Sequence, residues 1–148
     1  MEEDHVKYQS CIRPIVICLL QRDDDILVVE GKDTVKQTTF YRPPGGGIEF
    51  GETSVQAAQR EILEEFGAEI HNVQYKGIIE NIFEYQGRKM HELVFVCTAH
   101  FVDRVWYSKK KLKGQDGKGP FYAIWKSKQF FIKDAGRLVP DGLLYYLK

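Results

Sequence analysis

The segment from residue 89 to residue 101, KMHELVFVCTAHF, constrains the fold most, because it is apolar on both faces of an extended chain. Val94 and Val96 occupy even-numbered positions. The odd-numbered apolar positions are Leu93, Phe95, Cys97 and Phe101. Successive side chains of a strand point to opposite faces of its sheet, so a strand of this kind is covered on both sides. The segment therefore predicts a central strand with a further layer of structure against each face.

Other extended segments are predicted from apolar and β-branched runs between turn residues. These segments are residues 11–20, 26–32, 38–44, 73–87 and 121–126. The aspartate-rich residues 21–25 join the first two as a hairpin, and we interpret them as a solvated turn rather than a metal site. The glycine-rich residues 45–52 and the basic residues 108–120 are predicted to be loops. Several strands around a covered central strand predict a mixed sheet that lies between helices.

Residues 53–68 carry the start and stop signals of an α-helix. Thr53 and Gln56 fit a capping box at its beginning, and Gly67 fits the left-handed position that ends many helices. A second helix is predicted over residues 140–148, where a proline stands at the beginning.

The predicted helix at residues 53–68 separates apolar from acidic side chains at about 100° per residue. Its apolar stripe consists of Val55, Ala58, Ile62 and Phe66. Glu61 and Glu65 are four residues apart on another side and repel each other, and Glu64 converges on the same point. The helix dipole in this last turn favours cations instead. A solvated acidic face is one interpretation, but a divalent cation with oxygen ligands would relieve the repulsion, and broken local rules are typical of functional sites.

The overall composition limits the classes of partner. A length of 148 residues predicts a single domain, residues 1–148, that can bury a core without staples. The formal net charge is zero, which argues against a nucleic-acid or membrane-surface partner bound through overall charge. No apolar run approaches the about 20 residues that span a bilayer. The polar, acidic residues 1–10 do not resemble a signal peptide. We therefore expect a cytoplasmic protein without nucleic-acid or membrane partners.

The cysteines give the same expectation. Cys11, Cys18 and Cys97 are odd in number, form no closely spaced pair and each lie in an apolar run. This usage predicts buried, reduced thiols rather than disulfides or metal ligands.

The glycine-rich segment and the acidic helix together resemble a known motif. Gly46 is followed after five residues by Glu52, and after seven more by the run from Arg60 to Ala68, REILEEFGA. This spacing resembles the Nudix box, with the small Ala68 where a larger aliphatic residue is usual. The resemblance implies an α/β fold, namely a Nudix-type α/β/α sandwich with a mixed central sheet in which the box forms a loop-helix-loop. It also implies hydrolysis of a nucleoside diphosphate linked to another moiety.

The resemblance implies roles for the residues of the box. Glu61 and Glu65 are then the main metal ligands, with Glu64 as a further ligand and the carbonyl of Gly46 completing the shell. Arg60 orients a glutamate, either Glu61 or Glu52, because its planar fork suits a carboxylate.

The general base remains open at this point. Within the box, Glu64 or Glu61 could take the proton of the attacking water. Outside it, Glu92, Glu84 and Asp116 are candidates. Glu92 opens an apolar strand, so it either lies at the strand end facing the helix or is an exposed strand-end charge. The neighbouring His91 is interpreted as a strand-edge histidine.

A nucleoside needs a flat apolar slot with a few polar groups. Phe83 and Tyr85 share one strand face by alternation and are candidates for this slot, together with Phe40 and Tyr41. Arg42, directly before two prolines, could bind a phosphate. Core packing of the aromatic residues and a solvated arginine are the alternatives.

The function that the resemblance implies is Mg²⁺-dependent hydrolysis of a pyrophosphate bond, with Mn²⁺ as a substitute ion. The substrate is then a small nucleotide, for which a nucleoside triphosphate, ADP-ribose, a nucleotide sugar and a dinucleoside polyphosphate remain open. The alternative is a nucleotide-binding or regulatory domain that does not hydrolyse its ligand. A homodimer is the commonest assembly for such a chain.

Overall fold

A computed structural model describes residues 11–147 of the chain. The expectation that the first ten residues are not a signal peptide lies outside the described residues. Within the described part, no helix is both long and apolar enough to cross a membrane.

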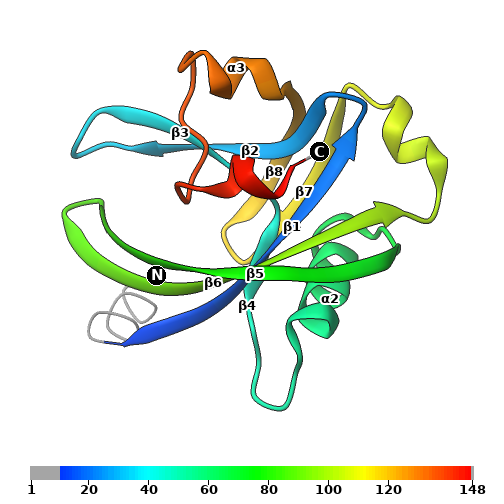
Figure 1. Ribbon diagram of the computed structural model, residues 1–148, viewed down its shortest axis with the longest axis horizontal. Helices are drawn as coiled ribbons and strands as arrows, with labels where there is room; N and C mark the ends of the chain where they lie inside the picture. The colour runs from blue at the N-terminus through cyan, green and yellow to red at the C-terminus, as the bar shows by residue number, and fades with distance from the viewer. Residues whose placement is uncertain (1–10, 148) are drawn as a thin grey trace.

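Eight strands form one strongly curled sheet, with strand order β5-β6-β1-β2-β8-β7 (Figure 1). In addition, β3 pairs with β2, and β4 pairs with β1. Among the strand pairs in the described residues, β1 and β6 run parallel and the others antiparallel, so the sheet is mixed as predicted. The strands are β1 (Ile12–Arg22), β2 (Asp25–Asp33), β3 (Thr38–Arg42), β4 (Gly45–Gly47), β5 (Ile70–Tyr85), β6 (Arg88–Phe101), β7 (Lys111–Asp116) and β8 (Gly119–Ser127).

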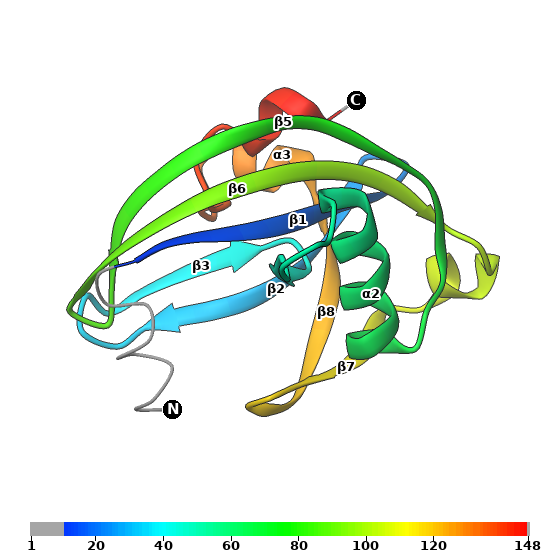
Figure 2. The ribbon, with the colours of Figure 1, turned by 90° about the horizontal axis from the view of Figure 1, so that it is seen from below.

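The divergence of β1 and β2 opens the molecule into two halves. The two strands pair only beside their turn, where Gln21 lies opposite Ile26 and Arg22 opposite Asp25. Farther from the turn, β1 pairs with β4 and β2 pairs with β3. The consecutive strands β3 and β4 therefore pair with the edges that the divergence of β1 and β2 leaves open. The β5–β6 hairpin therefore arches over one half, while β2 and β3 belong to the other (Figure 2).

Helix α2 (Ser54–Phe66) lies between the β5–β6 arch and the β7–β8 hairpin (Figure 2). Its capping box at Thr53 and Gln56 and the left-handed Gly67, with φ of 70°, are confirmed. The buried residues of the helix are Ala57, Ala58, Ile62 and Phe66, close to the predicted stripe. These side chains join one hydrophobic core with residues of β1, β6 and β7. The hydrophobic effect thus holds this apolar face of the helix against the sheet.

A second core covers the other face of the sheet, so the predicted α/β class with a mixed central sheet is confirmed. This core joins Val94 and Val96 of β6 to Phe131 of α3 (Lys128–Ile132) and Leu143 of η2 (Leu143–Tyr146), a 3₁₀ helix. The helical layer on this face is small. The prediction that β6 is a central strand covered on both faces is also confirmed, because the neighbouring Cys97 packs in the core under α2.

Two predicted loops contain strands. The first three residues of the predicted loop 45–52 pair with β1 as β4, although glycine is a poor strand former. At Gly45 any side chain would overlap the carbonyl group of Val16, so only glycine permits this close pairing. In the predicted basic loop, β7 buries Leu112 and Gly114 while its lysines face outward. The strand was missed because the lysines between the buried positions made the segment read as a basic loop.

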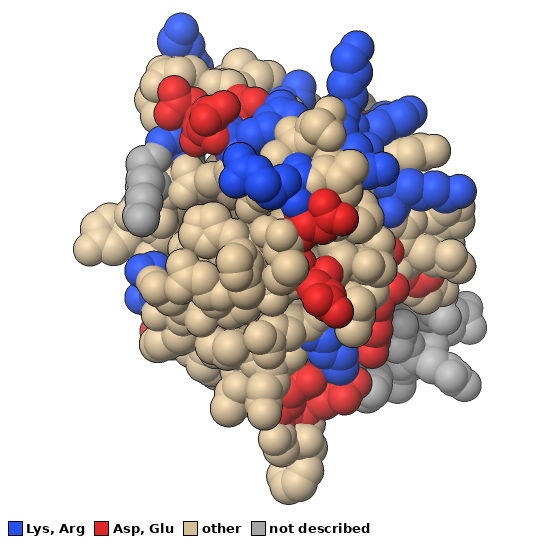
Figure 3. All heavy atoms as spheres, turned by 90° about the vertical axis from the view of Figure 1, so that its right-hand side faces the viewer, with Lys and Arg blue, Asp and Glu red and all other residues tan. Residues whose placement is uncertain are grey.

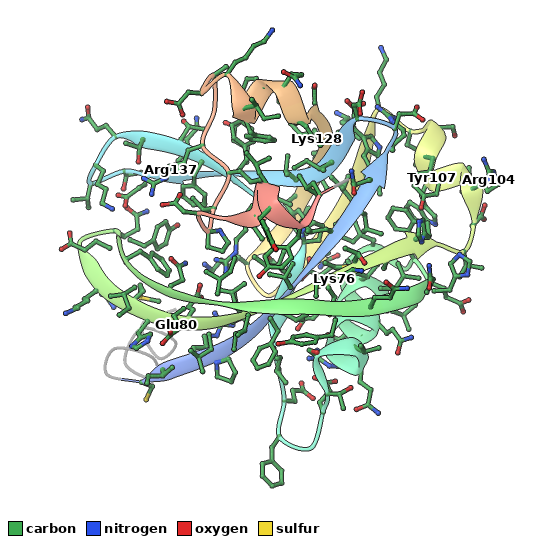
Figure 4. All side chains as sticks on the ribbon, in the orientation of Figure 1. Lys76, Glu80, Arg104, Tyr107, Lys128 and Arg137 are labelled. Carbon is green, nitrogen blue, oxygen red and sulfur yellow. The ribbon has the colours of Figure 1, made fainter. Side chains whose placement is uncertain are left out.

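The C-terminal helix predicted at residues 140–148 is wrong in extent. Among the described residues 140–147, only the four residues of η2 are helical, as a 3₁₀ turn. Two short helices were not predicted, namely α3 and the 3₁₀ helix η1 (Arg104–Ser108). In η1, the side chain of Tyr107 points toward β6 (Figure 4). Its hydroxyl oxygen accepts a hydrogen bond from the backbone N–H of Phe101, at 2.8 Å.

The cysteine prediction is correct for two of the three residues. Cys18 and Cys97 are buried and free, opposite each other on β1 and β6. Cys11 is free but exposed, because it precedes the first strand instead of belonging to its buried part. Burial raises the pKa of the Cys97 thiol and, together with that neighbour, the pKa of Cys18.

The charges are unevenly spread although the formal net charge is zero. Figure 3 shows Lys and Arg side chains gathered over the upper part of one face, with smaller acidic groups above and below them. Some lysines and arginines also form ring contacts, such as Lys111 over Tyr122 at 4.2 Å from the ring centre.

Candidate active site

The acidic end of α2 lies against β4. A Cβ atom at Gly46 would stand 2.5 Å from the carboxyl carbon of Glu61, so the backbone of β4 and this carboxylate are in direct contact. Glu61 is 15 % exposed, whereas Glu64 is 60 % exposed. The structure thus brings Gly46 and Glu61 together, and it requires a residue without a side chain at position 46.

Arg60 holds this end of the helix to the preceding loop. Its Nε and Nη2 atoms donate to the two carboxylate oxygens of Glu52, at 2.7 and 2.9 Å. Nη1 donates to Glu61 at 3.0 Å and to Glu64 at 3.2 Å, and Nη2 also donates to the carbonyl oxygen of Gly47 at 2.9 Å. Hydrogen bonds from Arg60 lower the pKa of Glu52. The hydrogen bonds to Glu52 and Glu61 in turn raise the pKa of Arg60. One guanidinium therefore contacts both glutamates that sequence reasoning proposed it would orient.

Glu65 is the glutamate of the box whose pKa is strongly raised. Burial, a hydrogen bond with Glu61, and the negative charges of Glu61, Asp116 and Glu64 raise the pKa of Glu65 to about 9. The contribution of Asp116 shows that the β7–β8 turn brings this carboxylate near the box, as the sequence allowed. A carboxyl group in such surroundings needs either a proton or a cation.

The carboxylates suit a divalent cation without forming a complete cage. Across the part of the chain that the structure describes, no three acidic, histidine or cysteine side chains stand together as a ready-made metal site. Glu61 and Glu64 both accept from Nη1 of Arg60, at 3.0 and 3.2 Å, and both contribute negative charge at Glu65. The convergence of the three carboxylates on a metal ion stays a prediction. Glu61 and Glu65 remain in contact beside the Gly46 backbone. Two carboxylates are enough for Mg²⁺, which keeps several of its waters.

A cavity of about 680 Å³ opens between β3 on one side and the β5–β6 hairpin on the other. Three strands supply most of its walls, largely through alternate side chains. The residues from these strands are Thr38, Thr39, Phe40 and Arg42 of β3, Asn81, Phe83, Glu84 and Tyr85 of β5, and Arg88, Met90 and Glu92 of β6. The chain end adds Arg137, which lies beside β3 (Figure 4).

The lining changes character along the cavity. Register pairs Asn81 with Glu92, Phe83 with Met90, and Tyr85 with Arg88. An apolar middle section with Phe83 and Met90 therefore separates two polar ends. Phe40 lies across from this floor, and its ring meets that of Tyr85 edge to face, with 5.9 Å between centroids. Planar apolar groups fit such a middle section, and charged groups fit its ends.

Two hairpin turns beside the cavity are joined by hydrogen bonds among Asp33, Thr34 and Gln86, which we call the clasp, and Asp33 also lines the cavity. The buried carboxylate of Asp33 accepts hydrogen bonds from backbone N–H groups of its own turn and, at 3.1 Å, from that of Gln86. The side-chain oxygen of Gln86 accepts from the backbone and hydroxyl of Thr34, at 3.0 and 2.7 Å. The clasp thus ties the β2–β3 turn to the β5–β6 turn.

The candidate substrate residues fall in this cavity, with one exception. Arg42, Phe83 and Tyr85 line it, as does Phe40. Tyr41 points the other way and packs against Phe130, with 5.5 Å between ring centroids. Four of the five candidates therefore line the cavity, and their substrate role stays a prediction.

Glu92 does not lie where either interpretation placed it. It is 2 % exposed, so it is no exposed strand-end charge. Its position also has the parity of Val94 and Val96, on the face of β6 opposite to α2, so it does not face the helix. It bonds Arg42 instead, at 3.0 Å. The neighbouring His91 is half-buried at the edge of the apolar segment.

Sequence reasoning missed several lining residues, above all Arg13 of β1. Arg88, Met90 and Asn81 were also missed. The signal that could have found these three is the same alternation that selected Phe83 and Tyr85. Arg13 could not be found this way, because its place depends on the parallel pairing of β1 with β6.

A mixed, curled sheet with a capped acidic helix against a glycine strand defines a class of α/β fold, and comparison with known proteins identifies it. The NUDIX domain model matches residues 12–121. The chain therefore belongs to the NUDIX domain family and has the fold of a Nudix-type hydrolase.

Solved structures resemble most of the chain. The NUDIX hydrolase from Nitrosomonas europaea superimposes with a TM-score of 0.60 at 22 % identity, covering 92 % of this chain and 85 % of that one. The MutT NUDIX hydrolase from Burkholderia pseudomallei gives a TM-score of 0.57 at 20 % identity, covering 80 % and 84 %.

Relatives with known roles resemble part of the chain. The NAD-capped RNA hydrolase NudC of Escherichia coli O1:K1 is 35 % identical over 69 residues, which are 47 % of this chain and 26 % of that protein. NudC of Klebsiella pneumoniae strain 342 gives the same values of 35 % over 69 residues, 47 % and 26 %. This chain thus spans about a quarter of the length of these relatives.

Proposed function

We propose that the protein hydrolyses the pyrophosphate bond of a nucleoside diphosphate linked to another moiety, in a reaction that depends on Mg²⁺. The observation that carries the proposal is the strained contact of Glu61 and Glu65 beside the Gly46 backbone, one strand away from a cavity of about 680 Å³. Members of the family that resemble this chain are hydrolases. Mn²⁺ is expected to substitute for Mg²⁺, because it accepts the same oxygen ligands.

In this proposal Glu61 and Glu65 hold the divalent cation, with the carbonyl of Gly46 as a further ligand. A bound cation supplies charge stabilisation for the phosphate oxygens and lowers the pKa of a water molecule. Glu64 is a further ligand or takes the proton of the attacking water, since it is exposed and its present partner Arg60 also holds Glu61. Arg60 fixes the carboxylates and is itself fixed by Glu52.

The cavity holds the nucleotide. Phe40 and Phe83 flank the section where a base or a sugar would lie, and Arg42 stands at the end nearer to the box. Positioning and charge stabilisation supply most of the rate enhancement in phosphoryl transfer. The proposal therefore needs only what this chain offers, namely a shaped cavity, cationic side chains in it and a carboxylate pair that can hold a metal ion.

The experiment is a substrate panel with Mg²⁺ or Mn²⁺ and a chelator control. It contains nucleoside triphosphates, ADP-ribose, nucleotide sugars and dinucleoside polyphosphates, and the NudC likeness adds NAD. We expect release of a nucleotide product from at least one substrate, and loss of release with EDTA. Binding of nucleotides without any turnover would instead assign the chain to the non-hydrolytic alternative. A membrane or nucleic-acid partner and dimer formation play no part in the proposal, and a homodimer is tested by the mass in solution.

A further inference from the structure

The β7–β8 hairpin has an outer face that neither core uses fully. Successive side chains of a strand alternate between the two faces of a sheet. Leu112 of β7 and Ala123 of β8 pack in the core with α2, so their sequence neighbours point to the opposite face. At these described strand positions the outer face has three lysines and no aspartate or glutamate. Its residues are Lys111, Lys113, Gln115, Pro120, Tyr122, Ile124 and Lys126.

The two sides of this hairpin therefore carry opposite charges. On the inner side, Asp116 contributes negative charge at Glu65 of the box. On the outer side, Lys111 and Lys113 are exposed, and neither forms an ion pair with a carboxylate of the described residues. Side chains two positions apart on a strand are spaced by about 7 Å. Positive groups repeated in this way can follow the backbone of an extended polyanion.

An exposed aromatic ring lies between these lysines. Tyr122 is 48 % exposed, belongs to neither core and stands directly opposite Lys113 in the strand register. The ammonium group of Lys111 lies over its ring, 4.2 Å from the centroid. A nucleobase that stacks on the ring takes the place of this ammonium group, which is then available to the adjacent phosphate.

The turn of the hairpin connects the outer face with the large cavity. Lys118 lies in this turn, is exposed and belongs to the cavity lining. At the other end of β7, Lys109 and Lys110 precede the strand and are exposed. A polyanion with one end in the cavity thus meets lysines along the whole hairpin. This connection rests on the proposed function, whereas the charge of the outer face does not.

We propose that the outer face of the β7–β8 hairpin binds a single-stranded nucleic-acid chain. Lys111 and Lys113 contact its phosphates, and Tyr122 stacks on one of its bases. A single strand fits better than a duplex, whose bases are already stacked on each other. It also fits better than a membrane, because a membrane is broad and flat, whereas these lysines form a strip two strands wide that leads to the cavity. The zero net charge of the chain does not oppose local binding of this kind.

Fluorescence anisotropy with a labelled oligouridylate of about twelve nucleotides tests binding, in EDTA and at low salt so that no turnover occurs. The wild type is compared with the double variant Lys111→Gln/Lys113→Gln. Each lost contact with a single-strand phosphate lowers the slope of log affinity against log salt by about 0.7, so we expect a slope that is lower by about 1.4. We also expect affinity at low salt to fall at least tenfold. The matched control is Lys32→Gln/Lys89→Gln, because these lysines are exposed on β2 and β6, outside the cavity lining and the hairpin.

The stacking contact is tested separately with Tyr122→Ala and Tyr122→Phe. The alanine variant should bind the oligouridylate about fivefold or more weakly, with the salt slope of the wild type. The phenylalanine variant keeps the ring and should bind like the wild type. Equal affinity of all three proteins, or equal affinity of the wild type for the single strand and for a duplex of the same length, would overturn the assignment. Thermal unfolding checks that each variant is folded, and the lysine variants decide the question if the alanine variant is not.

The remaining outcomes separate the inference from the proposed function. Absence of oligouridylate binding to the wild type, or an equal loss in both lysine double variants, rejects the inference. Lysine-dependent binding to vesicles of phosphatidylserine and phosphatidylcholine, without oligouridylate binding, assigns the face to a membrane and rejects it as well. Hydrolysis of a panel nucleotide by a protein that binds no oligouridylate leaves the proposed function intact. Lysine-dependent binding by a protein that hydrolyses nothing supports the inference and rejects the hydrolase.

Discussion

Replacement of Glu65 by Gln is expected to stabilise the metal-free protein while it abolishes catalysis. Burial, a hydrogen bond with Glu61 and neighbouring negative charges raise the pKa of Glu65 from 4.5 to about 9 in the folded protein. The unfolded chain loses this proton near its ordinary pKa, so the folded state loses stability progressively as the pH rises from about 4.5 to about 9. Gln carries no charge and can donate to Glu61 as the protonated carboxyl group does. The Glu65→Gln variant therefore does not lose this stability as the pH rises.

The size of the effect at pH 7 follows from the same values. One pKa unit corresponds to about 1.4 kcal/mol, and pH 7 lies about 2.5 units above the ordinary pKa, which gives an upper bound of about 3.4 kcal/mol. Because Glu65 is partly exposed, solvent reduces this bound, and about 1–3 kcal/mol is the working range. For a chain of this length, that range raises the melting temperature by about 2–12 °C.

The assay is thermal unfolding in EDTA at several pH values between 4 and 9. The difference in melting temperature between Glu65→Gln and the wild type should be close to zero at the acid end and grow with pH. Glu64→Gln is the matched control, because Glu64 is a neighbouring box glutamate that is 60 % exposed and already paired with Arg60 at 3.2 Å. A difference that does not change with pH, or an equal gain in the control, would refute the reasoning. Added Mg²⁺ should stabilise the wild type more than Glu65→Gln, and turnover of the variant should fall by orders of magnitude.

Three further changes test other parts of the site. Gly46→Ala should lower kcat by about 100-fold without unfolding the protein, because the new methyl group displaces the carboxylate of Glu61; activity close to that of the wild type would contradict the contact. Phe83→Ala should raise KM by about tenfold with little change in kcat, measured by initial rates, whereas an unchanged KM would remove this ring from the binding section. Asp33→Asn should lower the melting temperature near pH 7. Hydrogen bonds from backbone N–H groups, first that of Lys36, hold the pKa of Asp33 below 3.8, so the wild type keeps this stability above that pH and loses it as the pH falls further. The gap between variant and wild type should therefore close in acid, and a gap that persists there would show that charge is not the cause.

Local signals were sufficient for the helix that carries the box. The capping box at Thr53, the end at Gly67 and the buried face with Ile62 depend only on residues within a few positions of each other. The alternation in β6 likewise predicted its burial on both faces. Such features are encoded within one element, so periodicity and capping chemistry reveal them.

Features that depend on pairing between distant segments were not predictable in the same way. Gly45–Gly47 is a strand only because β1 offers it a partner, and nothing in three glycines favours an extended chain. Glu92 is buried because Arg42, fifty positions earlier, lies beside it. The sequence alone offered an exposed or a helix-facing carboxylate there, since it does not contain the register of β1, β3 and β6.

The clasp between the two hairpin turns has a consequence for how such a protein diversifies. Asp33 and Gln86 are joined in two hairpin turns away from the box, and surface turns generally tolerate insertions. A longer turn at either place would lengthen the chamber without moving Glu61 or Glu65. The length of ligand that the cavity accepts can thus change through these two surface turns, while the residues proposed to cleave the ligand stay in place.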